Sequence, residues 1–586
     1  MIYELPQLAS ATRGYSGAVL VQEDEPHYAA RLVRAVQGTD TFGAVWTAEH
    51  QRDPAMIPSL PEQILAAPAR LLAVVHVDVS ASDLIVCYRF LLPFLGFLAF
   101  FAALRAVGIR AACATLLLLW VYVDPGAISF KVFGGLLWNA HLMPFNRFSN
   151  PLFGLILFAV AFFCAAKALR TPFGLEPAST RRALGWALGA GVLTGGMFYV
   201  SLFYWTHMVG TLCVATLWLR TPGRFKVVAV SLACALLVSI PYWVSVRQLH
   251  GNPVYADLVW RNGLLVSGRG GGEILSNKTV WFFLLAAVPL AFRKEQGLRF
   301  LTAGIAAGVG CVFSSVITNV TLQNSHWYYT TIPLLGAGAL TTLDTLGRRP
   351  AFAKFRRLAV PSGAAVAALI LLGGAKASWA SLDWATQANK PGLGATDAPY
   401  AEAWSWLRAH ASPEAVVVAS EGTMGFVPLR SGLRVWTQAH TATETITFEE
   451  IYERNAVLWK LQGFTAARLE TWLCEQAGNI SQWDFGFPVA EHGRLVGLGR
   501  PAFDHDLSCL AAHNVALEYG KTENPLRALG SKYRIDYLVR GPMERDWPAA
   551  EQTLNLEPVA AFGTVRIDRV VGVRDNTMKA EEARGH

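Results

Sequence analysis

The sequence predicts a mainly α-helical, polytopic transmembrane bundle followed by a soluble α/β domain. Three observations carry this prediction. Hydrophobic residues make up 53% of the 586 residues and charged residues only 16%, whereas an ordinary soluble chain carries roughly 25% charged residues. The mean hydropathy is positive, at +0.33, and the apolar residues gather in long runs. From about residue 377 onward the composition becomes that of a soluble protein.

These shifts in composition divide the chain into four parts. Residues 1–83 are polar or amphipathic, with helices expected at 26–37 and 61–77, the second lying on the membrane surface rather than crossing it. Residues 84–376 hold the apolar runs of the bundle. A linker is predicted at 377–397, because Pro and Gly recur there. Helical and strand-like patterns alternate over 398–586, which indicates an α/β domain.

About ten segments of the bundle are predicted to cross the membrane, since a spanning helix needs about 20 mostly apolar residues. They lie near 84–106, 109–123, 150–169, 183–199, 203–219, 226–247, 279–293, 298–318, 327–346 and 356–376. Alternate loops between them are rich in Lys and Arg, and the positive-inside rule places those loops in the cytoplasm. Residues 1–83 and the C-terminal domain then lie outside, so we expect either a further span ahead of Met1 or a translocated N-terminus.

The net charge of +8 comes largely from these short loops, which disfavours nucleic acid as a partner. The cysteines show no CxxC spacing, and the sequence has no HExxH or EF-hand motif for a metal. Cys474 and Cys509 stand in the polar C-terminal region. They would pair as a disulfide if that region is extracytoplasmic, and would otherwise be two buried thiols.

Three adjacent carboxylates, Glu23, Asp24 and Glu25, directly precede the helix expected at 26–37. The positive end of a helix dipole favours negative charge at this position. A carboxylate here has the chemistry of a general base toward an acceptor hydroxyl. Together the three carboxylates could share a divalent cation with a substrate phosphate. The alternative is an ordinary solvated acidic loop.

The segment from Asp24 to Arg31, DEPHYAAR, resembles the D-E-x-x-Y-A motif in the first outside loop of GT-C glycosyltransferases. Those polytopic enzymes take sugars from polyprenyl-phosphate carriers, and they include the aminoarabinose lipid A transferases and the protein mannosyltransferases. The resemblance implies a GT-C-like bundle, catalytic roles for Asp24 and Glu25, and inversion at the anomeric carbon. This chain departs from the pattern in lacking an evident span before the motif and a second recognisable acidic motif.

Basic and aromatic residues in the outside loops are candidates for binding the substrate and its phosphate, because Arg and Lys stabilise a departing phosphate. The candidates are Tyr28, Lys131, Arg147, Arg269 and His326. The competing interpretation is that the basic residues reach toward lipid headgroups. Likewise, the aromatic residues that follow His326 would belong to the interfacial belt.

The sequence therefore predicts an inner-membrane glycosyltransferase. It would move a sugar from a polyprenyl-phosphate carrier to a lipid, glycan or protein acceptor on the outer face of the membrane. Two alternatives from other classes remain at this point. One is a transporter or flippase of lipid-linked sugars, although the sequence shows few acidic residues within spans and no internal repeat. The other is a non-catalytic membrane scaffold for envelope assembly.

Overall fold

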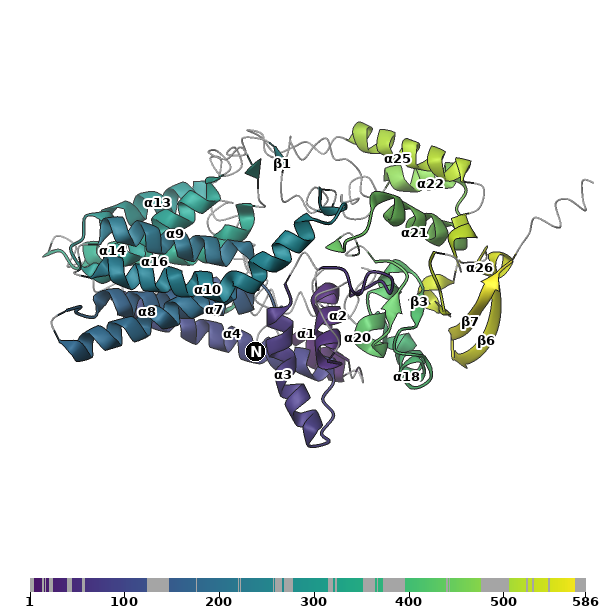
Figure 1. Ribbon diagram of the computed structural model, residues 1–586, viewed down its shortest axis with the longest axis horizontal. Helices are drawn as coiled ribbons and strands as arrows, with labels where there is room; N and C mark the ends of the chain where they lie inside the picture. Colours follow the sequence, from purple (N-terminus) through teal and green to yellow (C-terminus); the bar gives the residue numbers. More distant parts are fainter. Residues whose placement is uncertain are drawn as a thin grey trace, which may run out of the picture.

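The computed structural model places a helical bundle at one end, an α/β domain at the other, and the N-terminal helices between them (Figure 1). It describes the chain except for residues 1–4, 13–14, 16, 21–24, 39–44, 55–57, 124–146, 175, 220, 222, 257, 259–265, 268–277, 315–319, 322–323, 351–363, 366, 373–395, 439–440, 442, 476–504, 523–524, 530–531, 546, 548 and 575–586. The described part is mostly helical, with a small sheet in the C-terminal region, as the predicted fold class requires.

Helices occupy nine of the ten segments predicted to lie in the bundle. They are α4 (Ala81–Ala106), α5 (Ala111–Val123), α7 (Leu152–Arg170), α8 (Pro177–Met197), α9 (Leu202–Trp218), α10 (Arg224–His250), α13 (Lys278–Ala291), α14 (Gln296–Val312) and α16 (Tyr328–Gly347). The tenth segment, 356–376, falls largely outside the described residues. Among the described residues, α4, α7 and α10 are long and apolar enough to cross a membrane, and α5 and α14 hold shorter apolar stretches. The number of ten spans therefore stays a prediction.

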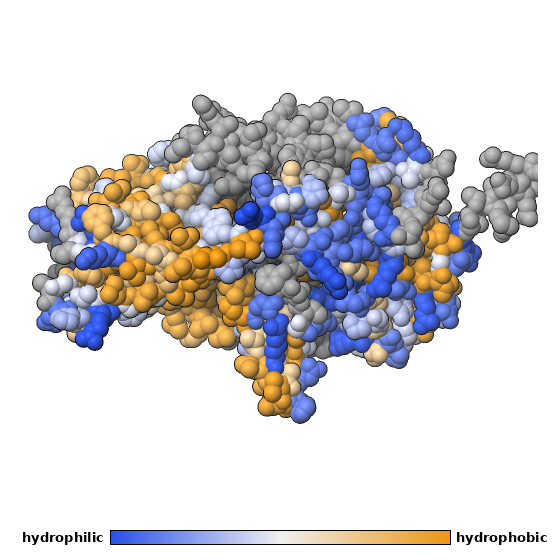
Figure 2. All heavy atoms as spheres, in the orientation of Figure 1, coloured by the Kyte–Doolittle hydropathy of each residue, from blue (hydrophilic) through white to orange (hydrophobic). Residues whose placement is uncertain are grey.

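Small residues let the bundle helices approach closely, as membrane helices often do. A Cβ added to Gly191 of α8 would lie 2.5 Å from the carbonyl oxygen of Ser231 on α10, and Gly195 faces Val238 in the same way. The outward surface is different, because Leu236 and Leu237 of α10 are more than half exposed. Figure 2 shows apolar side chains covering the visible face of the bundle, whereas the opposite end of the molecule is mainly hydrophilic. This contrast is what a bundle embedded in lipid requires.

In the described part of residues 1–80, three helices precede the bundle: α1 (Leu5–Thr12), α2 (Glu25–Val36) and α3 (Leu60–Val74). The last two confirm the helices predicted at 26–37 and 61–77. The end of α3 projects from the rest of the molecule (Figure 1), and its apolar side chains are exposed there, Leu71 at 71% and Val74 at 77%. Apolar groups exposed on a projecting tip fit the predicted position at the membrane surface, which remains a prediction.

The C-terminal domain is built on a five-stranded sheet in the order β4-β3-β5-β7-β6. Its strands are β3 (Val416–Val418), β4 (Arg434–Val435), β5 (Tyr537–Arg540), β6 (Leu554–Phe562) and β7 (Val565–Val573). Strand β3 runs parallel to β4 and β5, whereas β7 is antiparallel to β5 and β6. The sequence predicts strands at 415–419, 433–437, 535–539 and 564–570, and these correspond to β3, β4, β5 and β7. The exposed edge strand β6 was missed, because its residues lack a clear buried face.

Helices and short turns surround this sheet. They are η5 (Ala398–Tyr400), α18 (Ala401–His410), α19 (Glu421–Met424), α20 (Val427–Ser431), α21 (Phe448–Leu461), α22 (Ala466–Glu475), α25 (His505–Lys521), η7 (Pro525–Ala528), η8 (Pro542–Glu544) and α26 (Ala549–Thr553). A disulfide between Cys474 and Cys509 joins α22 to α25, with the two Cα atoms 4.6 Å apart. Of the two alternatives left open by the sequence, the structure has the disulfide.

The N-terminal segment packs on the C-terminal domain as well as on the bundle. The amide of Val435 in β4 donates to the carbonyl oxygen of Trp46 at 3.0 Å. The buried Glu444 in turn accepts hydrogen bonds from the amide of Trp46 and the hydroxyl of Thr47, both at 2.8 Å. The domain boundaries predicted at 83 and 377–397 remain predictions, and these contacts connect residues on either side of them.

Candidate active site

Helix α2 presents Glu25 and Tyr28 on the same face, because residues three apart are neighbours on a helix. The helix begins at Glu25, with Pro26 in its first turn, where a missing amide hydrogen costs nothing. Glu23 and Asp24 directly precede Glu25 in the chain and lie outside the described residues. The described part of the acidic motif therefore starts at a helix N-terminus, as the sequence predicted.

The Glu25 carboxylate is fully buried, and Arg89 of α4 donates to its Oε2 from Nη2 at 2.8 Å. Arg89 is itself 3% exposed and stands within an otherwise apolar stretch of α4. A charge in such surroundings is costly unless it is paired. The ion pair therefore fixes the first turn of α2 to the bundle. Sequence reasoning missed Arg89, although an arginine within the predicted span 84–106 was a signal for it.

A second buried carboxylate, Glu62 in the first turn of α3, links two further segments. Its Oε2 lies 3.3 Å from Nη2 of Arg31 on α2, and its Oε1 accepts a hydrogen bond from the Ser149 hydroxyl at 2.9 Å. Ser149 follows Arg147 by two residues, just before α7. Glu62 thus holds the segment of a predicted phosphate-binding residue against α2. No motif or spacing in the sequence singles out Glu62 or Ser149.

Tyr204 in the first turn of α9 lies within electrostatic range of both Tyr28 and Arg147. Its phenol donates to the carbonyl oxygen of Pro151 at 2.8 Å, and it interacts electrostatically with Tyr28, Arg147 and Tyr329. Gly154 of α7 leaves room for the ring, because an added Cβ there would collide with Tyr204. The Tyr204 ring therefore lies among residues from α2, from the segment before α7, and from α16.

His326 lies in η3 (Asn324–Trp327), which leads directly into α16. Its ring stacks on Phe203 of α9, with the ring centres 4.6 Å apart, and meets Tyr329 edge-on at 5.8 Å. The indole of Trp327 donates to the Thr206 hydroxyl at 2.9 Å. These contacts hold the imidazole beside the first turns of α9, which also carry Tyr204.

The described candidates thus gather around two elements, α2 and the start of α9. Glu25 and Tyr28 belong to α2, while Tyr28, Arg147 and His326 are linked through Tyr204, Tyr329 and Phe203. The other candidates, Asp24, Lys131 and Arg269, lie outside the described residues. A short antiparallel pair, β1 (Val266–Ser267) with β2 (Val320–Thr321), joins the loop that carries Arg269 to the loop before His326.

The far end of α2 is held by the C-terminal domain. Arg34 donates to the carbonyl oxygen of Gly432 and to the side chain of Gln37, both at 3.2 Å. Burial, together with the nearby Arg434, lowers the pKa of Arg34 to about 9. Gly432 has a φ of +76°, in the left-handed region that favours glycine. The helix that carries the acidic motif is therefore fixed at both ends.

No group of three metal-ligating side chains occurs among the residues that the structure describes. Two of the three carboxylates proposed for a divalent cation, Glu23 and Asp24, lie outside that part of the chain. The third, Glu25, has Arg89 as its partner. A cation at Glu25 would therefore compete with a guanidinium for the same carboxylate.

No family model matches the chain, and no curated protein matches it. The chain is similar to two crystal structures of the Archaeoglobus fulgidus oligosaccharyltransferase, a glycosyltransferase of the GT-C fold. One is tethered with an acceptor peptide containing the NVT sequon via a disulfide bond, with a TM-score of 0.44 and 12% identity. The other is a complex with Zn and sulfate, with a TM-score of 0.46 and 11% identity. Each match covers 97% of this chain and 73% of the other.

Proposed function

We propose that the protein is a membrane glycosyltransferase of the GT-C type. It moves a sugar from a polyprenyl-phosphate carrier to a lipid, glycan or protein acceptor. The observation that carries this proposal is that Tyr28 and Arg147 lie within electrostatic range of Tyr204, whose neighbour Phe203 stacks on His326. Helix α2, which carries Tyr28 and the acidic start, lies between the apolar bundle and the polar C-terminal domain (Figures 1 and 2). A lipid-linked donor needs both surroundings, because its tail is apolar and its sugar phosphate is charged.

In this proposal Asp24 is the general base and Glu25 assists it. The acceptor hydroxyl attacks the anomeric carbon of the donor sugar, and its proton passes to the Asp24 carboxylate. The bond between that carbon and the phosphate oxygen breaks, and the polyprenyl phosphate leaves with the electron pair. Glu25, held by Arg89, keeps the first turn of α2 in place while this occurs.

The leaving phosphate gains negative charge as the bond breaks, so nearby cations stabilise the transition state. Arg147 is the described residue with this role, and Lys131 and Arg269 are assigned to it by their places in the sequence. Ser149 and Glu62 hold the Arg147 segment against α2. His326 and Tyr28 line the same site and would contact the sugar or the phosphate.

The proposed orientation places the site and the C-terminal domain on the extracytoplasmic side of the inner membrane. Two observations support it. The Lys and Arg residues of the bundle are concentrated in alternate loops. The disulfide between Cys474 and Cys509 suits an oxidising compartment outside the cytoplasm.

Transfer of labelled sugar from a polyprenyl-phosphate donor, measured in proteoliposomes, tests the proposal. Asp24→Asn should slow transfer by about 100-fold or more, the usual contribution of a general base. Glu25→Gln should slow it less, because Glu25 acts through its pairing with Arg89. Glu23→Gln makes the equivalent change one position earlier and serves as the matched control.

Unchanged transfer in both Asp24→Asn and Glu25→Gln would rule out the catalytic assignment. Donor that crosses the bilayer without being transferred would instead indicate a transporter of lipid-linked sugars. A protein that binds neither donor nor acceptor under these conditions would point to a scaffold.

A further inference from the structure

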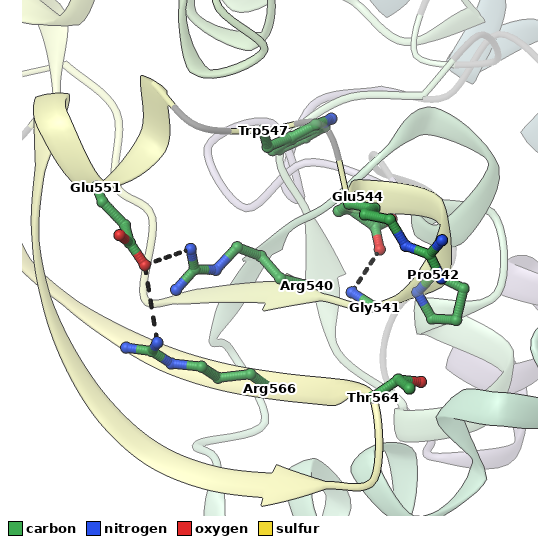
Figure 3. Close-up of a pocket in the computed structure, with 9 residues that line it drawn as sticks. Arg540, Gly541, Pro542, Glu544, Trp547, Glu551, Thr564 and Arg566 are labelled. Atoms are coloured by element: carbon green, nitrogen blue, oxygen red, sulfur yellow. Dashed lines mark hydrogen bonds and ion pairs between the residues drawn. The ribbon is translucent and has the colours of Figure 1, made fainter.

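A hollow of about 480 Å³ lies in the C-terminal domain, at the end of β5 and beside the turn between β6 and β7. Its lining includes three arginines, Arg540, Arg545 and Arg566, together with Glu551, Thr564 and Trp547. Figure 3 shows Arg540 and Arg566 lying side by side, with Glu551 beyond their guanidinium groups and Trp547 on one wall. Helix α26 and strand β7, which border the hollow, lie on the far side of this domain from α2 (Figure 1). The hollow is therefore separate from the site proposed above.

Two of these guanidiniums are held in place by one buried carboxylate. Arg540 of β5 and Arg566 of β7 are directly opposed across the antiparallel pair, where like charges normally repel. Asp568 is fully buried, and it accepts hydrogen bonds from Arg540 Nη2 at 2.6 Å and from Arg566 Nε at 2.6 Å. The fixed carboxylate therefore lets two arginines stand together at the surface of the sheet.

The Glu551 carboxylate also balances the charge of these arginines, but it is held only weakly. Glu551 of α26 accepts from Arg540 Nη1 at 2.7 Å and lies 3.7 Å from Arg566 Nη1, yet its side chain is 57% exposed. An ion pair this exposed contributes at most about 1 kcal/mol. Its hydrogen bond with Arg540 lowers the pKa of Glu551, so the carboxylate stays charged at neutral pH.

Arg545 adds a third positive charge to the lining. Its side chain is exposed and makes no ion pair or hydrogen bond with other described residues. Guanidiniums bind carboxylate and phosphate oxygens in a planar, two-pronged geometry. The lining thus holds two guanidiniums in fixed positions, a third that is available, and the Glu551 carboxylate, which can move aside. The other carboxylate of the lining, Glu544, is buried, and its oxygens accept hydrogen bonds from Gly541, Ser420 and Tyr400.

We propose that this hollow binds an oxyanion, the carboxylate or phosphate group of a ligand, between Arg540 and Arg566. In the free protein the Glu551 carboxylate occupies the place of that oxyanion. Ligand binding displaces Glu551, and Arg545 adds a further charged contact. The indole of Trp547 forms an apolar wall.

Binding of two small probes to the full-length protein in detergent tests this proposal, and inorganic phosphate and glucuronate separate the two sources of an oxyanion. We expect at least one probe to bind the wild-type protein. Glu551→Gln should tighten that binding by about threefold, because the competing carboxylate is gone and exposed pairs are worth this much. Arg566→Gln should weaken it by about tenfold, as expected for the loss of a charged hydrogen-bonding partner.

Glu557→Gln is the matched control, because Glu557 is an exposed carboxylate on the same hairpin and pairs with Arg569 away from the hollow. It should leave probe affinity unchanged. Arg545→Gln covers the case in which Arg566→Gln fails to fold, since Arg545 has no partner to lose among the described residues. The proposal is overturned if neither probe binds the wild type, if Glu551→Gln does not tighten binding, or if Arg545→Gln binds as tightly as the wild type.

Discussion

The two ends of α2 are anchored in different ways. At its first residue, a single buried ion pair joins Glu25 to Arg89 of the bundle. At its other end, Arg34 contacts the C-terminal domain. A second arginine, which has several hydrogen-bond partners, connects the surrounding N-terminal segment to the same domain. This arginine, Arg430, donates to Asp397 at 2.7 Å, to the Ala18 carbonyl oxygen at 2.8 Å and to the Ser82 hydroxyl at 3.0 Å.

The difference indicates that the two regions have different roles. Several contacts on the domain side, each to a different segment, pack the N-terminal segment on the C-terminal domain. On the bundle side, the first turn of α2 is held by the ion pair between Glu25 and Arg89, and Glu62 links Arg31 of the same helix to Ser149. The first of these links includes a proposed catalytic carboxylate. We therefore expect changes on the domain side to affect mainly stability, and changes on the membrane side to affect mainly transfer.

The largest expected effect is that of Arg430→Met. Asp397 and the phenol of Tyr15 would lose their buried partner, and breaking a buried ion pair costs about 3–5 kcal/mol. Burial, together with Asp397, raises the pKa of Tyr15, so this phenol stays neutral and keeps its hydrogen bond to Asp397 but does not balance the charge of that carboxylate. Denaturant unfolding and limited proteolysis of the N-terminal segment should both report the loss.

Arg534→Met is the control for this change, because Arg534 is half exposed and should shift stability by about 0.5 kcal/mol or less. Equal losses of stability in the two variants would contradict the stabilising role of Arg430.

Arg89→Met should have a smaller effect on stability, of about 3 kcal/mol, because it removes one ion pair and leaves the buried Glu25 carboxylate without its guanidinium partner. Transfer should fall more than stability does, since the first turn of α2 loses its anchor. The double variant Glu25→Gln with Arg89→Met should recover part of the stability, because no unpaired charge remains.

Arg105→Met, on the same helix but exposed, is the comparison for Arg89→Met and should leave transfer unchanged. A transfer rate in Arg89→Met equal to that of the wild type would show that the anchor is dispensable.

The packing of residues 45–53 on the C-terminal domain should depend on pH, because His50 takes part in it. Burial lowers the pKa of its imidazole, but hydrogen bonds with Glu450 at 2.9 Å and Asp53 at 2.6 Å outweigh burial and raise it to about 9. A raised pKa in the folded state stabilises the protonated form. The stabilisation is therefore complete below about pH 6.5 and is lost as the pH rises through about 9.

The loss should amount to about 2–3 kcal/mol at most, since one pKa unit corresponds to about 1.4 kcal/mol and the His50 side chain is 20% exposed. Thermal unfolding measured from pH 6 to pH 10 should show a decline that is absent in His50→Gln. His513→Gln, which removes an exposed histidine paired with Glu470, should keep the decline.

The sequence predicted the positions of the bundle helices, because their apolar runs are long and are separated by basic loops. It also predicted the helix that follows the acidic motif, since Pro26 and the spacing of Tyr28 and Leu32 are local features. It could not predict the pairing of Glu25 with Arg89, which are 64 residues apart, or that of Glu62 with Ser149, which are 87 apart. Such pairs depend on which helices pack together, and periodicity within one segment does not encode that choice.

The association of Trp46 with the edge strand β4 was hidden for a similar reason. Residues around Trp46 have no strand pattern of their own, and their backbone groups are satisfied by Val435 and Glu444 nearly 400 residues later. The disulfide could be predicted from the sequence only in part. Two cysteines in a polar region suggested it, but only the packing of α22 against α25 brings them together.

The central claim is that the donor binds where α2, the segment at Arg147 and the start of α16 meet. A polyprenyl-phosphate donor with a photoreactive diazirine on its first isoprene unit tests this claim directly, with labelled peptides identified by mass spectrometry. The account predicts labelling within 147–151 and 324–329, competed by unlabelled donor. Labelling confined to the C-terminal domain, or spread evenly over the bundle, would contradict it.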